Sequence, residues 1–199
     1  MNAPILPHLR ILDFLDAETH AALLAWTLKS EPRFVPAQLA GGMVNPEVRR
    51  AQVLRDLGPL AAVLDARMRE EAPHWAAALR STPFTTTEVE LELAAHNDGA
   101  HFTLHSDTYS RAEVARGDRM LSAVYYFHRQ PRAFEGGALR LHRLGAAPGD
   151  PGCDIAPDDN SLVVFPAWGP HEVMPVRCPS LAFADSRFAV NCWIYRARA

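Results

Sequence analysis

The spacing of apolar residues changes near residue 84, and this change constrains the fold more than any other feature of the sequence. Before that point apolar side chains recur every three or four residues, whereas the segment TTTEVELELAAH (85–96) alternates apolar and acidic residues. A helix places residues three or four apart on one face, and a strand places every second residue on one face. The sequence therefore predicts a helical N-terminal half followed by a half built from strands.

Three helices are predicted within the first 80 residues. Asp16 is a suitable N-cap for a helix that ends at Glu31-Pro32, and Asn45-Pro46 is a second start signal, with Pro46 as the first helical residue. Gly58-Pro59 opens the third helix. Pro73 is expected to break that helix before a short helical turn at 75–80, because proline lacks the N–H that a helix interior needs.

About seven strands are predicted after residue 84. Asn97-Asp98-Gly99 is a turn signal between the segment 85–96 and HFTLHSD at 101–107, which predicts a hairpin. Further extended runs lie at 120–127, 136–142, 160–166, 171–176 and 187–195. Many short strands preceded by helices predict an α+β fold, an antiparallel sandwich or open barrel backed by a helical layer. We expect a single domain over 1–199, with helical support at about 1–82 and a β core at about 83–197.

Charge and cysteine usage exclude several classes of partner. The net charge of −3 comes without a cluster of basic residues, so no nucleic acid and no anionic membrane is expected as a partner. The three cysteines, Cys153, Cys178 and Cys192, form no Cys-x-x-Cys motif, which argues against a disulfide framework and a zinc knuckle. No apolar run is long enough for a membrane span, and we expect a cytoplasmic protein.

The motif His105-Ser106-Asp107 is the sharpest sign of chemistry. On a strand, His105 and Asp107 share one face and can reach one metal ion, and His171 is the best candidate for a third ligand. Two histidines and one carboxylate leave three coordination positions open, as in non-haem Fe(II) oxygenases. A lone His-x-Asp also arises by chance, so the motif needs support from elsewhere in the chain.

Arg187 supplies that support. It begins the extended run RFAVNCWIY, which should pack beside the strand that follows His171. An arginine that projects into an apolar interior is costly unless it meets a carboxylate, which its planar guanidinium binds through two hydrogen bonds. The simpler interpretation is a surface arginine whose stem lies over the sheet.

The order of these segments resembles the prolyl 4-hydroxylase-like branch of the Fe(II)/2-oxoglutarate dioxygenases. The similar series runs from His105-x-Asp107 through SAVYYF, EGGALRLH and FPAWGPHEVMPV to RFAVNCWIY, and covers roughly residues 84–196. The strongest piece is HEVxPV followed by Arg-x-Ala-x-x-x-Trp. The resemblance implies a double-stranded β-helix, a jelly-roll barrel with the N-terminal helical layer supporting one sheet.

The resemblance also implies a role for each site residue. His105, Asp107 and His171 would bind Fe(II), and Arg187 would grip the distal carboxylate of 2-oxoglutarate. Tyr126 falls where related enzymes carry a tyrosine that bonds the same carboxylate. Its neighbour Tyr125 should point to the opposite face of the strand and pack in the core.

One departure from the family pattern concerns the end of the strand before the hairpin. Where related hydroxylases have a tyrosine, this chain has Ala95-His96, so the residue that holds the near end of 2-oxoglutarate is open, with His96 a candidate. Trp193 should share the face of Arg187 and wall the pocket. Gly136-Gly137 is interpreted as a bulge or tight entry, and Arg49 as plain surface or as a group facing an acidic substrate.

The resemblance implies an enzyme that hydroxylates an unactivated C–H bond, of a prolyl residue or a related amino acid or peptide. Its cofactors would be Fe(II) and 2-oxoglutarate, its co-products succinate and carbon dioxide, and ascorbate would support it. A dioxygenase acting on a small natural product, a non-catalytic cupin-like module that binds or senses a ligand, and a hydrolytic zinc site stay open. The sequence leaves the substrate and the oligomeric state undetermined.

Overall fold

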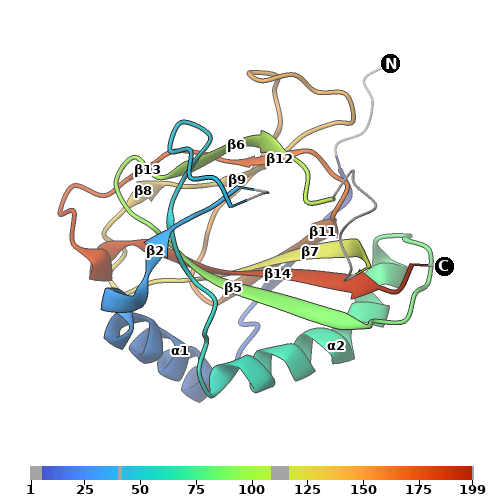
Figure 1. The fold of residues 1–199 in the computed structure, drawn as a ribbon, viewed down its shortest axis with the longest axis horizontal. Helices are drawn as coiled ribbons and strands as arrows, with labels where there is room; N and C mark the ends of the chain where they lie inside the picture. The colour runs from blue at the N-terminus through green and yellow to red at the C-terminus, as the bar shows by residue number, and fades with distance from the viewer. Residues whose placement is uncertain (1–5, 40–41, 109–116, 199) are drawn as a thin grey trace.

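Two antiparallel sheets and two helices form the fold in the computed structural model, which describes residues 6–39, 42–108 and 117–198 (Figure 1). The larger sheet has the strand order β1 (Leu9–Leu12), β11 (Ser161–Pro166), β7 (Asp118–Phe127), β14 (Arg187–Arg196), β5 (Glu88–His96), β4 (Gln52–Leu54) and β2 (Val35–Pro36). The smaller sheet has the order β10 (Cys153–Ile155), β9 (Leu139–Leu141), β12 (His171–Val173), β6 (His101–His105) and β3 (Arg49–Arg50). A short ribbon pairs β13 (Val176–Arg177) with β8 (Glu135–Gly136).

The larger sheet lies between the helices and the smaller sheet (Figure 1). One face of it packs on α1 (Ala17–Lys29) and α2 (Leu60–Ala78), and Leu93, Leu121 and Val190 share an apolar cluster with residues of both helices. Because side chains alternate along a strand, the intervening residues point to the other face, toward the smaller sheet. β14 runs between β7 and β5, with Arg187 directly opposite His96.

The first helix is confirmed, and the other helical predictions need correction. Asp16 caps α1 through a hydrogen bond from the Thr19 amide, and a short 3-10 helix (Glu31–Arg33) follows Ser30. The helix predicted from Asn45-Pro46 is wrong. That segment forms a single turn and then β3 and β4, which pair with β6 and β5. The start signal is local, and pairing with strands of both sheets overrides it.

Pro73 does not break its helix, contrary to the prediction. α2 continues through it to Ala78 because Pro73 lies on the exposed side, while Ala72, Trp75 and Ala76 are buried around it. A carbonyl left without its helical N–H partner on that side can bond to water, and burial of the neighbours offsets the cost of the proline.

The extended runs after residue 84 all contain strands in the structure. The runs at 136–142 and 171–176 each split in two, into β8 and β9 and into β12 and β13, and β1 and β10 had no sequence signal. A second 3-10 helix (Phe183–Asp185) precedes β14. The sheet-rich fold with a helical layer agrees with the expected class, and closure of the sheets into a barrel stays a prediction. None of the helices in the described ranges has the length and apolar character needed to cross a bilayer.

The acidic face of β5 is buried at Glu92, although the alternation suggested that only the apolar face is buried. Leu93 faces the helices, and Glu92 on the other face is only 4% exposed. The interior between the two sheets therefore contains charged side chains, which burial tolerates only where they are paired.

Candidate active site

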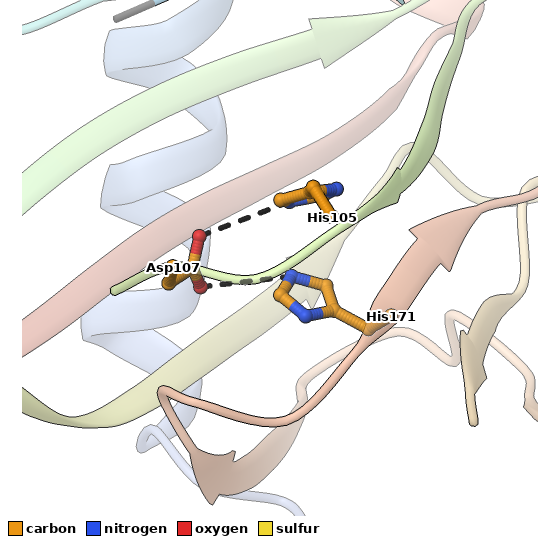
Figure 2. A group of neighbouring side chains, drawn as sticks. All are labelled: His105, Asp107 and His171. Carbon is orange, nitrogen blue, oxygen red and sulfur yellow. Dashed lines mark ion pairs between the residues drawn. The ribbon is translucent and has the colours of Figure 1, made fainter. Parts of the chain in front are cut away.

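Two histidines from neighbouring strands of the smaller sheet and an aspartate just beyond one of these strands converge at one point. His105 ends β6 and His171 begins β12, where the two residues are paired directly across the strands. Asp107 lies two residues beyond the end of β6, and its amide donates to the Ala167 carbonyl at 2.9 Å. Its Oδ1 is 3.8 Å from His105 Nε2 and its Oδ2 is 3.6 Å from His171 Nε2 (Figure 2). One ligand atom from each residue lies within 4.8 Å of the others, a suitable spacing around a single metal ion.

Backbone carbonyls orient both histidines for metal binding. Nδ1 of His105 donates to the Thr103 carbonyl at 2.8 Å, and Nδ1 of His171 donates to the Gly169 carbonyl at 2.9 Å. A carbonyl only accepts, so in each neutral ring Nδ1 carries the proton and Nε2 presents a lone pair. Both lone pairs face Asp107 (Figure 2), which is the arrangement that a divalent cation requires.

The protonation states favour a metal ligand set. Burial and the nearby His171 lower the pKa of His105 to about 3, so this ring is neutral near pH 7. Burial alone would raise the pKa of Asp107. It is nevertheless lowered, because His171 and His105 face the carboxylate and the Ser122 hydroxyl donates to Oδ2 at 2.5 Å. The site therefore offers the carboxylate of Asp107 and the neutral imidazole of His105 at neutral pH.

A buried arginine lies in the same cavity as the triad. Arg187 is 1% exposed, and burial lowers its pKa. Nη1 donates to His96 Nδ1 at 3.0 Å, and Nε has no hydrogen-bond partner among the described residues. Its guanidinium carbon lies 4.7 Å from the ring centre of Tyr126, whose buried hydroxyl also lacks a partner in the part of the chain described. A cation and a hydroxyl left unpaired beside a cavity favour an anionic ligand there.

Glycine makes room for this arginine. Gly137 has a φ of +69°, and a Cβ atom built on it would lie 2.7 Å from Arg187 Cδ and 2.9 Å from Val176 Cγ2. Gly137 therefore marks a close approach of the backbone to Arg187, and the interpretation of Gly136-Gly137 as a bulge or tight entry stays a prediction.

His96 contacts the guanidinium and lines the cavity. Burial, together with the positive charges of Arg187 and Arg49, lowers its pKa well below the usual value. The sequence suggested His96 for the near end of 2-oxoglutarate, but the structure places it against Arg187, at the end assigned to the distal carboxylate. Trp193 lines the cavity as expected, and Tyr125 packs in the apolar cluster on the helix side.

Sequence reasoning missed a buried ion pair at this cavity. Arg49, interpreted as surface or as facing an acidic substrate, is 9% exposed and donates to Glu92 Oε1 at 2.6 Å. Its guanidinium carbon lies 5.1 Å from the ring centre of Phe102, which stacks on His105 with 3.5 Å between ring centres. The sequence placed Arg49 in a predicted helix, so its burial was not expected. Ser122 could have been found from the sequence, because it lies four residues before Tyr126 and residues four apart on a strand share one face.

The arrangement can bind a divalent cation and a small anion side by side. The triad could supply the cation ligands, and Arg187 with Tyr126 could supply donors for a carboxylate in the same cavity. The residues present therefore fit an Fe(II) ion and a dicarboxylate such as 2-oxoglutarate.

Comparison with known sequences agrees with this interpretation. A sequence model of the 2OG-Fe(II) oxygenase superfamily matches residues 91–195. An uncharacterized PKHD-type hydroxylase from Synechocystis sp. is 32% identical over 191 residues, covering 92% of this chain. The chain spans 61% of the length of that relative.

Solved structures share the fold. A prolyl-4-hydroxylase from Pseudomonas putida superposes with a TM-score of 0.70 at 23% identity, over 97% of this chain and 94% of that one. A prolyl hydroxylase from Trichoplax adhaerens, solved with a hypoxia inducible factor peptide fragment, has a TM-score of 0.68 at 19% identity, over 94% of this chain and 83% of that one.

Proposed function

This chain belongs to the 2OG-Fe(II) oxygenase superfamily, and from that premise we propose that it is an Fe(II)- and 2-oxoglutarate-dependent dioxygenase. His105, Asp107 and His171 would hold the iron, and Arg187 with Tyr126 would bind the distal carboxylate of 2-oxoglutarate. Bound iron and 2-oxoglutarate supply the oxidation: one oxygen atom of O₂ enters the substrate as hydroxyl, and the other enters succinate as 2-oxoglutarate loses carbon dioxide.

The observation that carries the proposal is the buried Arg187 guanidinium, which has no negatively charged partner among the described residues. A fully buried cation is costly to leave without a counter-charge, and no carboxylate of the described residues bonds to it. The charge is balanced when an anion enters the cavity. Because the metal ligands line the same cavity, that anion can also reach the metal, which is the geometry that a 2-oxo acid needs.

Each protein group then has a defined task. Ser122 orients Asp107, and the two backbone carbonyls orient the histidines, so the three ligands are set before the metal binds. Phe102, Trp193 and Val173 line the cavity with apolar surface and exclude water from the reacting C–H bond.

We further propose that the substrate is a prolyl residue or a related amino acid or peptide. The support is the fold shared with prolyl hydroxylases, one of them solved with a peptide fragment, and the aromatic wall at Trp193 and Phe102, which suits an apolar ring. Ascorbate is included as a supporting reductant.

The test is succinate production by anaerobically purified protein that receives Fe(II), 2-oxoglutarate and ascorbate and is then exposed to air. We expect slow succinate formation from the wild type, faster turnover with prolyl peptides or free amino acids that are substrates, and a mass gain of one oxygen in the product. Asp107→Ala and Arg187→Ala should abolish it. Asp154→Ala and Arg177→Ala are matched controls, because both residues form ion pairs on the surface.

Three other outcomes would overturn the proposal. Binding of Fe(II) and 2-oxoglutarate without succinate in the presence of any tested substrate would indicate a ligand-binding or sensing module. Activity without oxygen would indicate a hydrolytic metal site. Failure to bind either cofactor would remove the basis of the assignment.

A further inference from the structure

A register shift in β6 places Phe102 against His105. Across the pairing of β6 with β12, His105 lies opposite His171 and Phe102 lies opposite Val173, so β6 has one residue more than β12 between the two pairs. A surplus residue of this kind is a β-bulge, and it allows two residues three positions apart to face the same side, which regular alternation does not. Both rings line the cavity, and their centres are 3.5 Å apart with the planes inclined by 17°.

The His105 ring is therefore restrained in two directions. Its Nδ1 donates to the Thr103 carbonyl, which fixes the ring in its own plane. The Phe102 ring lies against its face, which opposes tilting out of that plane. The position of Nε2, the nitrogen that faces Asp107, depends on both restraints.

Arg49 contacts Phe102 from the neighbouring strand. Arg49 on β3 pairs directly with Phe102 on β6, so the two side chains share one face, and the guanidinium carbon lies 5.1 Å from the centre of the Phe102 ring. Two hydrogen bonds hold the guanidinium there, from Nη2 to Glu92 Oε1 at 2.6 Å and from Nη1 to the Gln38 carbonyl at 3.3 Å. Because Glu92 belongs to β5, Arg49 connects the Phe102 ring with the larger sheet across the interior.

The charge of Arg49 is already balanced, in contrast to that of Arg187. Glu92 is its counter-charge, whereas no carboxylate of the described residues bonds to Arg187. A buried ion pair contributes little net stability, because the loss of hydration offsets the attraction between the charges. What the pair with Glu92 does provide is a fixed position for the Arg49 side chain on Phe102.

We propose that Arg49 is a positioning residue of the metal site, which holds Phe102 against His105 and so keeps the His105 ring in place as a ligand. The inference rests on the proposed function, because the position of His105 matters only if the triad binds a metal ion. Metal affinity should then depend on a side chain at position 49 that packs on Phe102, and not on the charge of the Arg49–Glu92 pair.

Two double variants separate packing from charge. Both replace Glu92 with glutamine, so that no buried carboxylate is left unpaired, and both keep the net charge of the wild type. Arg49→Met/Glu92→Gln, the methionine variant, keeps a long side chain that can pack on Phe102. Arg49→Ala/Glu92→Gln, the alanine variant, lacks it. Circular dichroism and urea denaturation would establish that both variants fold.

The first measurement is anaerobic competition with a fluorescent chelator for Fe(II). We expect the alanine variant to bind Fe(II) about tenfold more weakly than the wild type, the lower end of the range for groups that orient metal ligands, and the methionine variant to stay within about threefold. The second measurement is the visible absorption of the Co(II)-loaded protein, whose bands depend on the arrangement of the ligands. We expect these bands to shift in the alanine variant, which an ion pair that only stabilises the fold would not cause.

Phe102→Leu tests whether Arg49 acts through Phe102. Leucine lacks the flat face that lies on His105, so this substitution alone should weaken Fe(II) binding about tenfold. Added to the alanine variant, it should leave the total loss at about tenfold and not about a hundredfold, because both changes interrupt the same contact.

The outcomes distinguish this inference from the proposed function. If the wild type binds neither Fe(II) nor Co(II), the proposed function fails and the inference with it. If the wild type binds them and the two double variants lose affinity equally, or neither loses any, packing on Phe102 does not position His105 and only the inference is wrong. It is also wrong if Phe102→Leu binds Fe(II) as tightly as the wild type, a result that does not require the alanine variant to fold.

Discussion

At the scale of single residues, the carboxylate of Asp107 depends on groups outside the triad. The Ser122 hydroxyl donates to its Oδ2, and Arg119 Nη1 donates to its backbone carbonyl at 3.2 Å. Arg119 also lies over the ring of Trp193, with its guanidinium carbon 4.2 Å from the ring centre. Arg119 thus contacts both Asp107, a proposed metal ligand, and Trp193 in the wall of the cavity. A substitution of either residue is expected to alter the position of the other through Arg119.

Removal of the Ser122 hydroxyl should weaken metal binding. Ser122→Ala deprives Asp107 of a hydrogen bond that both orients it and lowers its pKa, and loss of such a partner costs about 10- to 100-fold in metal affinity. Competition with a fluorescent chelator for Fe(II) measures the change. Ser122→Thr keeps the hydroxyl and should stay near the wild-type affinity; equal affinities for Ser122→Ala and the wild type would show that Asp107 is oriented without Ser122.

At the scale of elements, β7 carries two adjacent tyrosines with opposite tasks. Tyr125 faces the helices, where its hydroxyl donates to Asn160 Oδ1 at 2.9 Å and accepts from His20 Nδ1 at 2.6 Å. Tyr126 faces the cavity, and its hydroxyl has no partner among the described residues. The alternation of a strand alone separates a side chain that packs against the helices from one that lines the cavity.

The two tyrosine-to-phenylalanine variants should therefore differ in kind. Tyr125→Phe breaks two hydrogen bonds and should lower the free energy of unfolding by about 1–2 kcal/mol, without changing 2-oxoglutarate affinity. Tyr126→Phe should leave stability unchanged and weaken 2-oxoglutarate about tenfold. Urea denaturation and anaerobic calorimetry measure the two quantities, and a reversed pattern would mean that the strand faces are assigned wrongly.

A second prediction at this scale concerns the segment between β8 and β9, where Gly137 lies close to Arg187. Gly137→Ala should weaken 2-oxoglutarate binding, because the added Cβ would displace the Arg187 side chain. Gly145→Ala is the matched control, since Gly145 has a φ of +78° but no atom within 4 Å of an added Cβ.

Both alanines carry the backbone strain of a positive φ, which costs about 1–2 kcal/mol of stability. Only Gly137→Ala should also lose affinity, measured by the same titration. An equal loss in both variants would indicate that strain, and not contact with Arg187, is responsible.

At the scale of the whole molecule, buried neutral histidines couple stability to pH. His96 and His105 have pKa values below the usual 6.5 in the folded, metal-free protein, while the unfolded chain restores the usual value. Below pH 6.5 the unfolded state therefore binds more protons than the folded state. The contribution of these two histidines to the free energy of unfolding is largest above pH 6.5, and it declines as the pH falls toward their folded pKa values, about 3 for His105.

We expect the unfolding free energy of the metal-free protein to fall between pH 7.0 and 5.5, with a limiting slope of about 1.4 kcal/mol per pH unit for each such histidine. Urea denaturation at a series of pH values measures this slope. His96→Asn should reduce it, because one titrating group is lost. The carboxyl groups with lowered pKa values, such as Asp107 and Asp118, do not contribute to this slope. Their contribution to the free energy of unfolding is lost only below about pH 4. A slope that His96→Asn leaves unchanged would contradict the assignment.

The sequence alone predicted much of the strand-rich half. Period two marked β5, extended runs marked β7, β11 and β14, and the pattern of His105, Asp107 and His171 anticipated residues that the structure brings together. Arg187 and Tyr126 also lie in the predicted cavity, and their roles stay predictions. Alternation and short spacings are local properties, so a strand and its two faces can be recognised without knowing its neighbours.

Only the tertiary structure decided what the N-terminal region does and what completes the cavity. The segment 45–54 carries a helix start signal but pairs with β5 and β6, which buries Arg49 against Glu92. His96 and Arg187 are 91 residues apart in the sequence, and they form a hydrogen bond because β5 and β14 pair in a register that places them opposite each other. Such contacts depend on which strands lie side by side, and the free energy of that pairing is distributed over the whole sheet and not over the local sequence.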